Sequence, residues 1–257
     1  MLGGGIIRNL NNKELKIRIL RIGSIISLVF GILLIGQVLL GKNTSNNVFY
    51  INNIPVHQQE LKWAIAEEKN KVRSQLIQEQ NIKSEMFSWI NRYDAKKAYE
   101  HLVEKAIHSV TKKKVQQGLA KKAGLIKEID YDTFHNKWLT TNQYRQEAVE
   151  KGTEIIYGPV IFEEKEYYEY EMNNLMLKLR ERIQEELKVT DEEIRKVYEE
   201  NKDYFLNEPL EKVKNHVLLF IAQQAYEDQV EHAINNAKIK HVNEKLILQI
   251  LKGEGIL

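Results

Sequence analysis

Residues 48–60 have the sequence VFYINNIPVHQQE, and within this stretch the side-chain pattern changes from that of a β-hairpin to that of a helix. The run 48–51 is rich in β-prone residues, while Asn52 and Asn53 tolerate the left-handed backbone of a tight turn. A second short β-prone run follows the turn. From Gln58 the apolar residues recur with the 3.6-residue period of a helix. The stretch therefore predicts a strand, a turn and a second strand that lead directly into a long helix.

Downstream of the hairpin, the sequence predicts a mainly α-helical domain. Lys, Glu, Gln, Leu, Ile and Ala dominate its composition, and the chain has only three prolines. The capping residues Asp130, Gly152 and Thr190 mark ends of predicted helices. We expect helices over residues 58–80, 94–122, 130–152, 163–187, 190–198, 209–234 and 246–251, and a strand over 238–242. The predicted fold class is mainly α with a small β element.

Upstream of the hairpin, an uncharged and largely apolar run begins at Ile22 and ends at Leu40. At ~1.5 Å of rise per residue, a helix of this length spans roughly 30 Å, the thickness of the hydrocarbon core of a bilayer. A helix also satisfies its own backbone hydrogen bonds in lipid. The run therefore predicts a transmembrane helix that anchors the chain in a membrane.

The charges that flank this run predict its orientation. Residues 1–42 carry six basic side chains and one acidic side chain, a net +5, and only one of the bases, Lys42, follows the run. Basic residues stay on the cytoplasmic side, so we expect a cytoplasmic N-terminus and an extracytoplasmic segment 43–257. The total net charge of +2 leaves −3 for that segment. A net negative charge argues against a nucleic-acid partner.

The predicted organisation is a cytoplasmic segment 1–21, a transmembrane helix 22–40, a polar tether 41–47 and one helical domain 48–257. A cleaved signal peptide is the alternative for the N-terminal part. The apolar run is long for a signal peptide, however, and no small-x-small cleavage site follows it. The chain has no cysteine, so neither a disulfide nor a lipid-bearing cysteine is expected.

Three stretches resemble the SurA-type and PrsA-type extracytoplasmic foldases. Residues 48–60 resemble the opening strand, turn and helix start of these proteins, with Asn53 where the family usually has glycine. Residues 189–205, VTDEEIRKVYEENKDYF, resemble the segment that leads from the chaperone domain into the parvulin prolyl isomerase domain. Residues 212–242 are similar to the closing segment that returns to the chaperone domain. The resemblance implies a SurA-like chaperone domain in which the first strand, at Tyr50, pairs with the last.

In that family the parvulin domain stands between the last two of these segments. Here only six residues separate Phe205 from Lys212. Gly253 and Gly255 are the only glycines after Gly158, which argues against a loop-rich β domain in this region. The sequence therefore predicts a SurA-like chaperone domain without its isomerase.

Residues that could carry out chemistry give weak signals. Glu104 and His108 are four residues apart on a predicted helix and could bind a metal with a third ligand, but such pairs on a Lys/Glu-rich helix usually face solvent. The acidic residues in 163–171 could act as an acid/base pair, but charges at a helix start also favour the macrodipole. His57 is predicted to lie on the surface. We expect no catalytic residue, no metal and no cofactor.

Aromatic residues are concentrated in the middle of the chain. A set of helices lined by rings can bind unfolded segments, because rings provide a large apolar area at a small cost in entropy. Most of these rings could equally be core residues. Tyr167, Tyr168 and Tyr170 cannot all face one side of a helix, so at least one should be exposed. The candidate client-binding residues are Trp138, Tyr144, Tyr157, Phe162, Tyr167, Tyr168 and Tyr170.

Three functional hypotheses follow. The first is a membrane-anchored extracytoplasmic chaperone that binds unfolded or secreted polypeptides without covalent chemistry. The second is a peptidyl-prolyl isomerase, as the family would imply. The third is a dedicated adaptor of one membrane complex. A broad apolar cradle would favour many clients, and a single flat patch would favour one partner.

Overall fold

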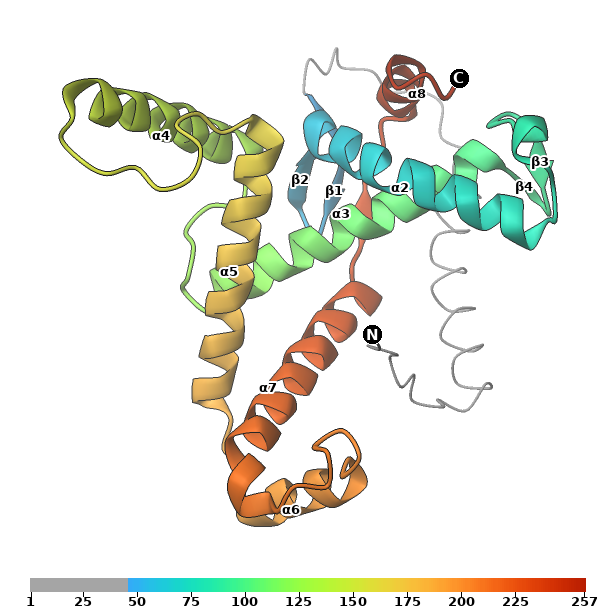
Figure 1. Ribbon diagram of the computed structural model, residues 1–257. Helices are drawn as coiled ribbons and strands as arrows, with labels where there is room; N and C mark the ends of the chain where they lie inside the picture. Colours follow the sequence, from blue (N-terminus) through green and yellow to red (C-terminus); the bar gives the residue numbers. More distant parts are fainter. Residues whose placement is uncertain (1–45) are drawn as a thin grey trace. The chain divides into compact units, whose positions relative to one another are not determined.

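The structure is a computed structural model that describes residues 46–257. These residues are mainly helical, as predicted, and they also form two small sheets (Figure 1). The helices are α2 (Gln58–Glu79), α3 (Ala98–Lys122), α4 (Tyr131–Lys151), α5 (Glu164–Glu186), α6 (Asp191–Glu200), α7 (Leu210–Asn235) and α8 (Glu244–Gly253), with a 3-10 turn η1 (Ser84–Met86). The strands are β1 (Asn47–Ile51), β2 (Ile54–His57), β3 (Arg92–Tyr93), β4 (Lys96–Lys97) and β5 (Ile239–Lys240).

The predicted cytoplasmic segment 1–21, the predicted transmembrane helix 22–40 and most of the predicted tether lie outside the described residues. Among the helices that are described, none combines the length and the apolar character that a membrane span needs. The predicted anchor therefore stays a prediction from the sequence.

The first sheet joins the two ends of the described chain. β1 and β2 form the predicted hairpin, and the φ angles of Asn52 (50°) and Asn53 (68°) are left-handed, as such a turn requires. On its other side β1 pairs antiparallel with β5, which places Ile51 opposite Ile239. The Asn52 side chain strengthens this junction, because its Oδ1 accepts a 2.9 Å hydrogen bond from the Lys238 backbone N–H. The predicted pairing of the first strand with the last is confirmed.

Helices α2 and α3 pack side by side and also contact β1 (Figure 1). α2 begins at Gln58, as predicted. α3 begins at Ala98 rather than at Asp94, because the β3–β4 hairpin occupies the residues just before it and Asp94 sits in its turn with a φ of 56°. This hairpin was not predicted, since two-residue strands leave no alternating pattern in the sequence.

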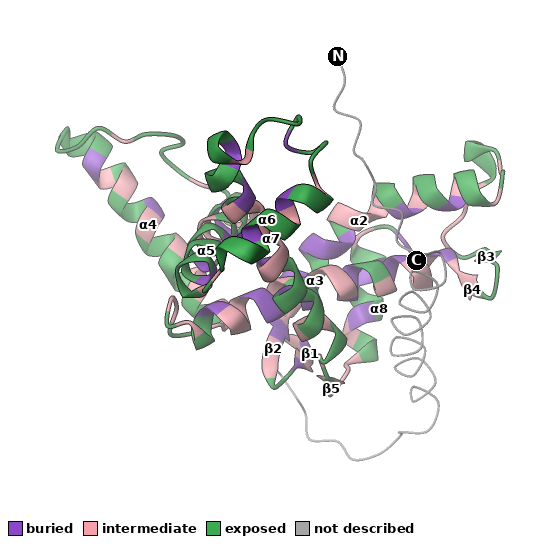
Figure 2. Cartoon of the chain, turned by 90° about the horizontal axis from the view of Figure 1, so that it is seen from below, coloured by how far each residue is buried: buried purple, intermediate pink, exposed green. Residues whose placement is uncertain are grey.

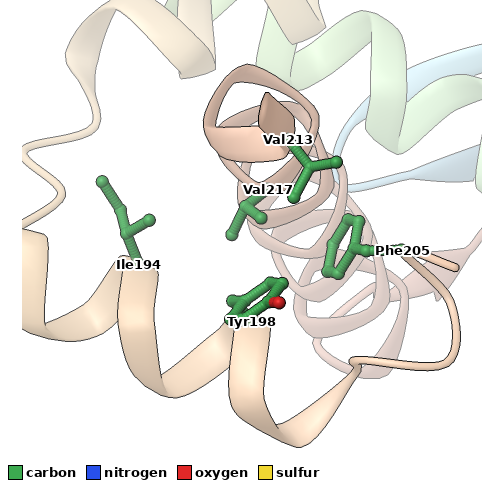
Figure 3. Close-up of a cluster of buried hydrophobic side chains, with 5 residues drawn as sticks. All are labelled: Ile194, Tyr198, Phe205, Val213 and Val217. Carbon is green, nitrogen blue, oxygen red and sulfur yellow. The ribbon is translucent and has the colours of Figure 1, made fainter. Parts of the chain in front are cut away.

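Helices α5, α6 and α7 form a second packed region. The predicted capping box starts α6, since the Thr190 hydroxyl accepts from the Glu193 N–H and the Glu193 carboxylate accepts from the Thr190 N–H. A small apolar core then joins α6 to α7, as Figure 3 shows, and consists of Ile194, Tyr198, Phe205, Val213 and Val217. Residues 201–209 connect the two helices directly.

α4 differs from the other long helices because it packs mainly against α5. It begins after the predicted cap Asp130 and ends at Gly152, whose left-handed φ of 62° closes the helix. Only Asn142 and Ala148 are buried on it, so most of the helix is exposed or half-buried (Figure 2). We call α4 together with the returning segment 153–162 the arm.

Candidate functional site

A groove of about 950 Å³ lies between the segment 125–130, the first turns of α4, and α5. Its apolar lining comes from all three segments and includes Leu125, Ile126, Phe134, Met172, Leu175 and Leu177. Charged side chains, among them Lys127, Glu171, Lys178 and Glu181, also line it. The groove therefore offers apolar surface next to charges of both signs.

A buried ion pair between α2 and α3 lies next to this groove. Glu60 of α2 and Lys114 of α3 are 2.7 Å apart (Oε1 to Nζ), and their side chains are 4% and 1% exposed. The hydroxyl of Tyr168 donates to the same Glu60 oxygen. Burial, together with the Glu60 charge, raises the pKa of Tyr168 well above its usual range, so the phenol stays protonated. Glu60 thus fixes α2, α3 and α5 to one another beside the groove.

One polar atom of the groove has no partner within residues 46–257. It is the side-chain oxygen Oε1 of Gln117, which is buried and accepts no hydrogen bond. The amide nitrogen of the same side chain lies 3.3 Å from the sulfur of Met172, and the Gln117 side chain also hydrogen-bonds with Tyr168. A buried acceptor without a donor is unfavourable.

A second polar cluster fixes the base of α4. The imidazole of His57 stacks on the Tyr131 ring, with centroids 3.9 Å apart. The Glu164 carboxylate accepts from the Tyr131 hydroxyl and also contacts the His135 ring nitrogen. Burial and the hydrogen bond to Glu164 raise the pKa of Tyr131, which keeps its hydroxyl a donor. These contacts connect α4 to the hairpin and to α5.

His57 is half-buried rather than fully exposed, and its contacts are structural. Its Nδ1 accepts from the Gln59 N–H and caps α2, while the Glu60 carboxylate accepts from the His57 N–H in return. Burial lowers the pKa of His57, although the nearby carboxylates of Glu60 and Asp132 oppose this effect. His57 is therefore a neutral structural residue that joins the hairpin to α4.

Four of the seven candidate client-binding residues lie together. Phe162 has its ring centroid 5.5 Å from that of Tyr167 and 5.7 Å from that of Tyr170. Trp138 joins them by donating its indole N–H to the Phe162 carbonyl. Tyr167 is buried, and Tyr170 is the exposed residue of the tyrosine group, at 50%. Tyr170 also lines the groove.

The other three candidates lie apart from this group. Tyr168 is buried, with its ring 5.1 Å from those of Trp63 and Phe134. Tyr144 and Tyr157 are exposed on the arm, and the Tyr157 side chain is 83% exposed. The seven residues thus divide into a packed group, a residue beside Glu60 and two surface residues.

The weaker chemical candidates have structural partners. Glu104 pairs with Lys96, and among the acids of residues 163–171, Glu171 pairs with Lys137 and Glu164 contacts His135. Within residues 46–257, no group of three or more His, Asp or Glu side chains could hold a metal ion. Three acids of this cluster thus have basic partners, since Glu169 also pairs with Lys165.

Sequence reasoning missed Glu60, Lys114 and Gln117. These residues occupy ordinary positions on amphipathic helices, and Lys114 lies in a run of three lysines. Their burial depends on how α2, α3 and α5 pack, so no local pattern signals it. Comparison of the chain with protein-family models, with curated proteins and with solved structures found no match.

Proposed function

We propose that this chain is a membrane-anchored, extracytoplasmic chaperone that holds unfolded or secreted polypeptides in the groove between α4 and α5. The observation that carries the proposal is the groove itself, in which exposed apolar side chains lie next to charges of both signs. Leu177 and Tyr170, each about half exposed, are available to a client. A half-open groove of this kind suits extended segments of varied sequence.

The energetics of such binding are modest for each contact. Full burial of one Leu or aromatic side chain contributes about 1.5–3 kcal/mol. A client that covers Leu177 and Tyr170 would therefore bind reversibly. The lysines and glutamates of the groove are paired or solvated, so they can accommodate polar client residues. Reversible and unselective binding is what a holding chaperone needs.

The topology adds support for the SurA-type and PrsA-type resemblance. We propose that residues 48–257 form a SurA-like domain in which the terminal β5 strand closes the sheet against β1. Residues 1–21 would be cytoplasmic, and 22–40 would anchor the domain. Protease protection of the two ends in intact cells or inverted vesicles would test this topology.

The structure has different consequences for the two alternative functions. A peptidyl-prolyl isomerase would need a catalytic domain, but residues 201–209 connect α6 to α7 without one. A dedicated adaptor would need one docking patch, and the α6–α7 tip offers exposed Tyr204, Leu206 and Leu219 beside a hollow of about 520 Å³. The adaptor is therefore the stronger alternative.

The deciding experiment uses residues 43–257 in two assays, suppression of aggregation of an unfolded test protein and acceleration of prolyl cis/trans isomerisation in a peptide. We expect suppression without acceleration. Leu177→Glu, which places a charge in the groove, should reduce suppression several-fold. Leu248→Glu on α8 is the matched control, because Leu248 is similarly exposed but lies outside the groove.

Each other outcome has a distinct meaning. Acceleration would show that a catalytic site exists and would favour the isomerase. A protein that neither suppresses aggregation nor accelerates isomerisation would favour the adaptor. Equal loss in Leu177→Glu and Leu248→Glu would place client binding elsewhere than in the groove.

A further inference from the structure

The segment 153–162, here called the strap, runs back along α4 without regular secondary structure. Three α4 side chains hold it through six hydrogen bonds, and every one of these bonds goes to its backbone. Arg145 donates to the carbonyls of Tyr157 and Pro159. Trp138 and Asn142 both donate to the carbonyl of Phe162.

Asn142 is the most informative of the three side chains. Its Nδ2 donates to the Phe162 carbonyl and its Oδ1 accepts from the Phe162 N–H, each at 2.9 Å. One amide side chain thus pairs with both backbone groups of a single residue. Asn142 is also one of only two buried residues on α4. Through these two bonds Asn142 recognises the backbone of residue 162 rather than its side chain.

In contrast to its backbone, which is bound to α4, the strap has mostly exposed side chains. Ile155 and Tyr157 are about four-fifths exposed, and Ile161 is about half exposed. The Phe162 ring is packed between Arg145 and the rings of Tyr167 and Tyr170, and Ile156 is half-buried. Departure of residues 153–161 from α4 would therefore expose little apolar surface that is now buried. The strap is held by bonds that another extended segment could replace.

We propose that this face of α4 is a backbone-binding site for an extended polypeptide segment, and that the strap occupies it until such a segment displaces it. This inference rests on the proposed chaperone function, of which it names the ligand class and a second binding site. Main-chain hydrogen bonds give affinity that does not depend on sequence. A client can bind only to molecules from which the strap has left. The apparent affinity for a client is therefore reduced in proportion to the fraction of such molecules.

The test loosens the strap without changing the side chains that bind it. Gly158 has a φ of +79°, and an added Cβ would meet nothing closer than an Arg145 atom at 3.9 Å. Gly158→Ala therefore disfavours the bound conformation of the strap without a clash. Gly124→Ala is the matched control, because Gly124 has a φ of +73° and lies at the end of α3, outside the strap. Phe162→Ala loosens the strap by a second route, removal of its packed ring.

The measurement is fluorescence-detected binding of a labelled peptide with the strap sequence TEIIYGPVIF to the full chain in lipid nanodiscs. We expect Gly158→Ala to bind the peptide about tenfold more tightly than wild type. Phe162→Ala should also bind it more tightly, and Gly124→Ala should not. Adding Asn142→Ala to Gly158→Ala should abolish the gain. A peptide methylated on the backbone nitrogen of its last residue, which corresponds to Phe162, should bind at least several-fold more weakly.

The proposal is overturned if neither strap variant binds more tightly than wild type, or if the methylated peptide binds as well as its parent. Aggregation suppression by the same samples separates this inference from the proposed function. Suppression that is independent of the strap variants would leave the chaperone function standing and remove the inference. Strap-dependent peptide binding without suppression of aggregation would support the binding site on α4 and contradict the proposed chaperone function.

Discussion

Replacement of Lys114 by methionine tests the buried ion pair beside the groove. The change removes the ammonium that lies 2.7 Å from Glu60 but keeps a side chain of similar length. The Glu60 carboxylate then retains only the hydrogen bonds from the Tyr168 hydroxyl and the His57 N–H. An uncompensated buried charge of this kind destabilises a protein by about 3–5 kcal/mol. Since small domains are stable by about 5–15 kcal/mol, Lys114→Met should remove about a fifth or more of the total.

The assay is urea unfolding of residues 43–257, followed by circular dichroism, for a full double-mutant cycle. Glu60→Gln combined with Lys114→Met should cost clearly less than the sum of the two single changes, because no isolated charge remains. Lys71→Met is the matched control: Lys71 and Glu68 are 2.8 Å apart, close to the separation of the buried pair, but Lys71 is exposed, so the free energy of unfolding should stay within error. If Lys114→Met were as mild as Lys71→Met, the reasoning about the buried pair would be refuted.

Three further changes test separate parts of the fold by the same urea unfolding. Leu251→Ala should cost about 2–5 kcal/mol, because the side chain is fully buried on α8, and a loss below about 1 kcal/mol would mean that α8 is not docked. Asp130→Ala removes the N-cap of α4 and should cost about 1 kcal/mol, measured also as faster amide exchange in the first turn of α4. Burial, with help from Lys105 and Lys112, lowers the pKa of His108, so the folded state binds this proton less readily than the unfolded state and loses stability as the pH falls below about 6.5. His108→Gln should therefore make unfolding less dependent on pH between pH 7 and pH 5, and an unchanged dependence would contradict this assignment.

Local signals predicted the ends of the elements well. The Asn52-Asn53 turn, the Asp130 and Thr190 caps and the Gly152 stop each depend on residues a few positions apart. Such interactions are the same wherever the segment lies in the fold, so the sequence carries them completely. The β1–β5 pairing joins distant segments, and its prediction came from the family resemblance rather than from a local pattern.

The parts that sequence could not predict all depend on packing between helices. Glu60 and Lys114 look like solvated residues until α2 and α3 are placed side by side. His57 looked like a surface residue because its stacking partner, Tyr131, is far away in the sequence. The aromatic candidates were similarly ambiguous, since helical spacing alone does not separate the buried Tyr167 from the exposed Tyr170.

The exposure of the arm is related to its proposed binding role. α3 buries eleven residues, whereas α4 buries two, although the helices are of similar length. Helices in proteins gain most of their stability from packing, so α4 depends unusually strongly on its caps and on the bonds to the strap. If the strap leaves α4, another extended segment has to take its place to restore the lost contacts. Binding of a client to this face would thus also order the arm, and amide exchange along α4 should slow when the peptide binds to Gly158→Ala. Exchange that is unchanged by a bound peptide would mean that α4 is stable without the strap and that the two events are not coupled.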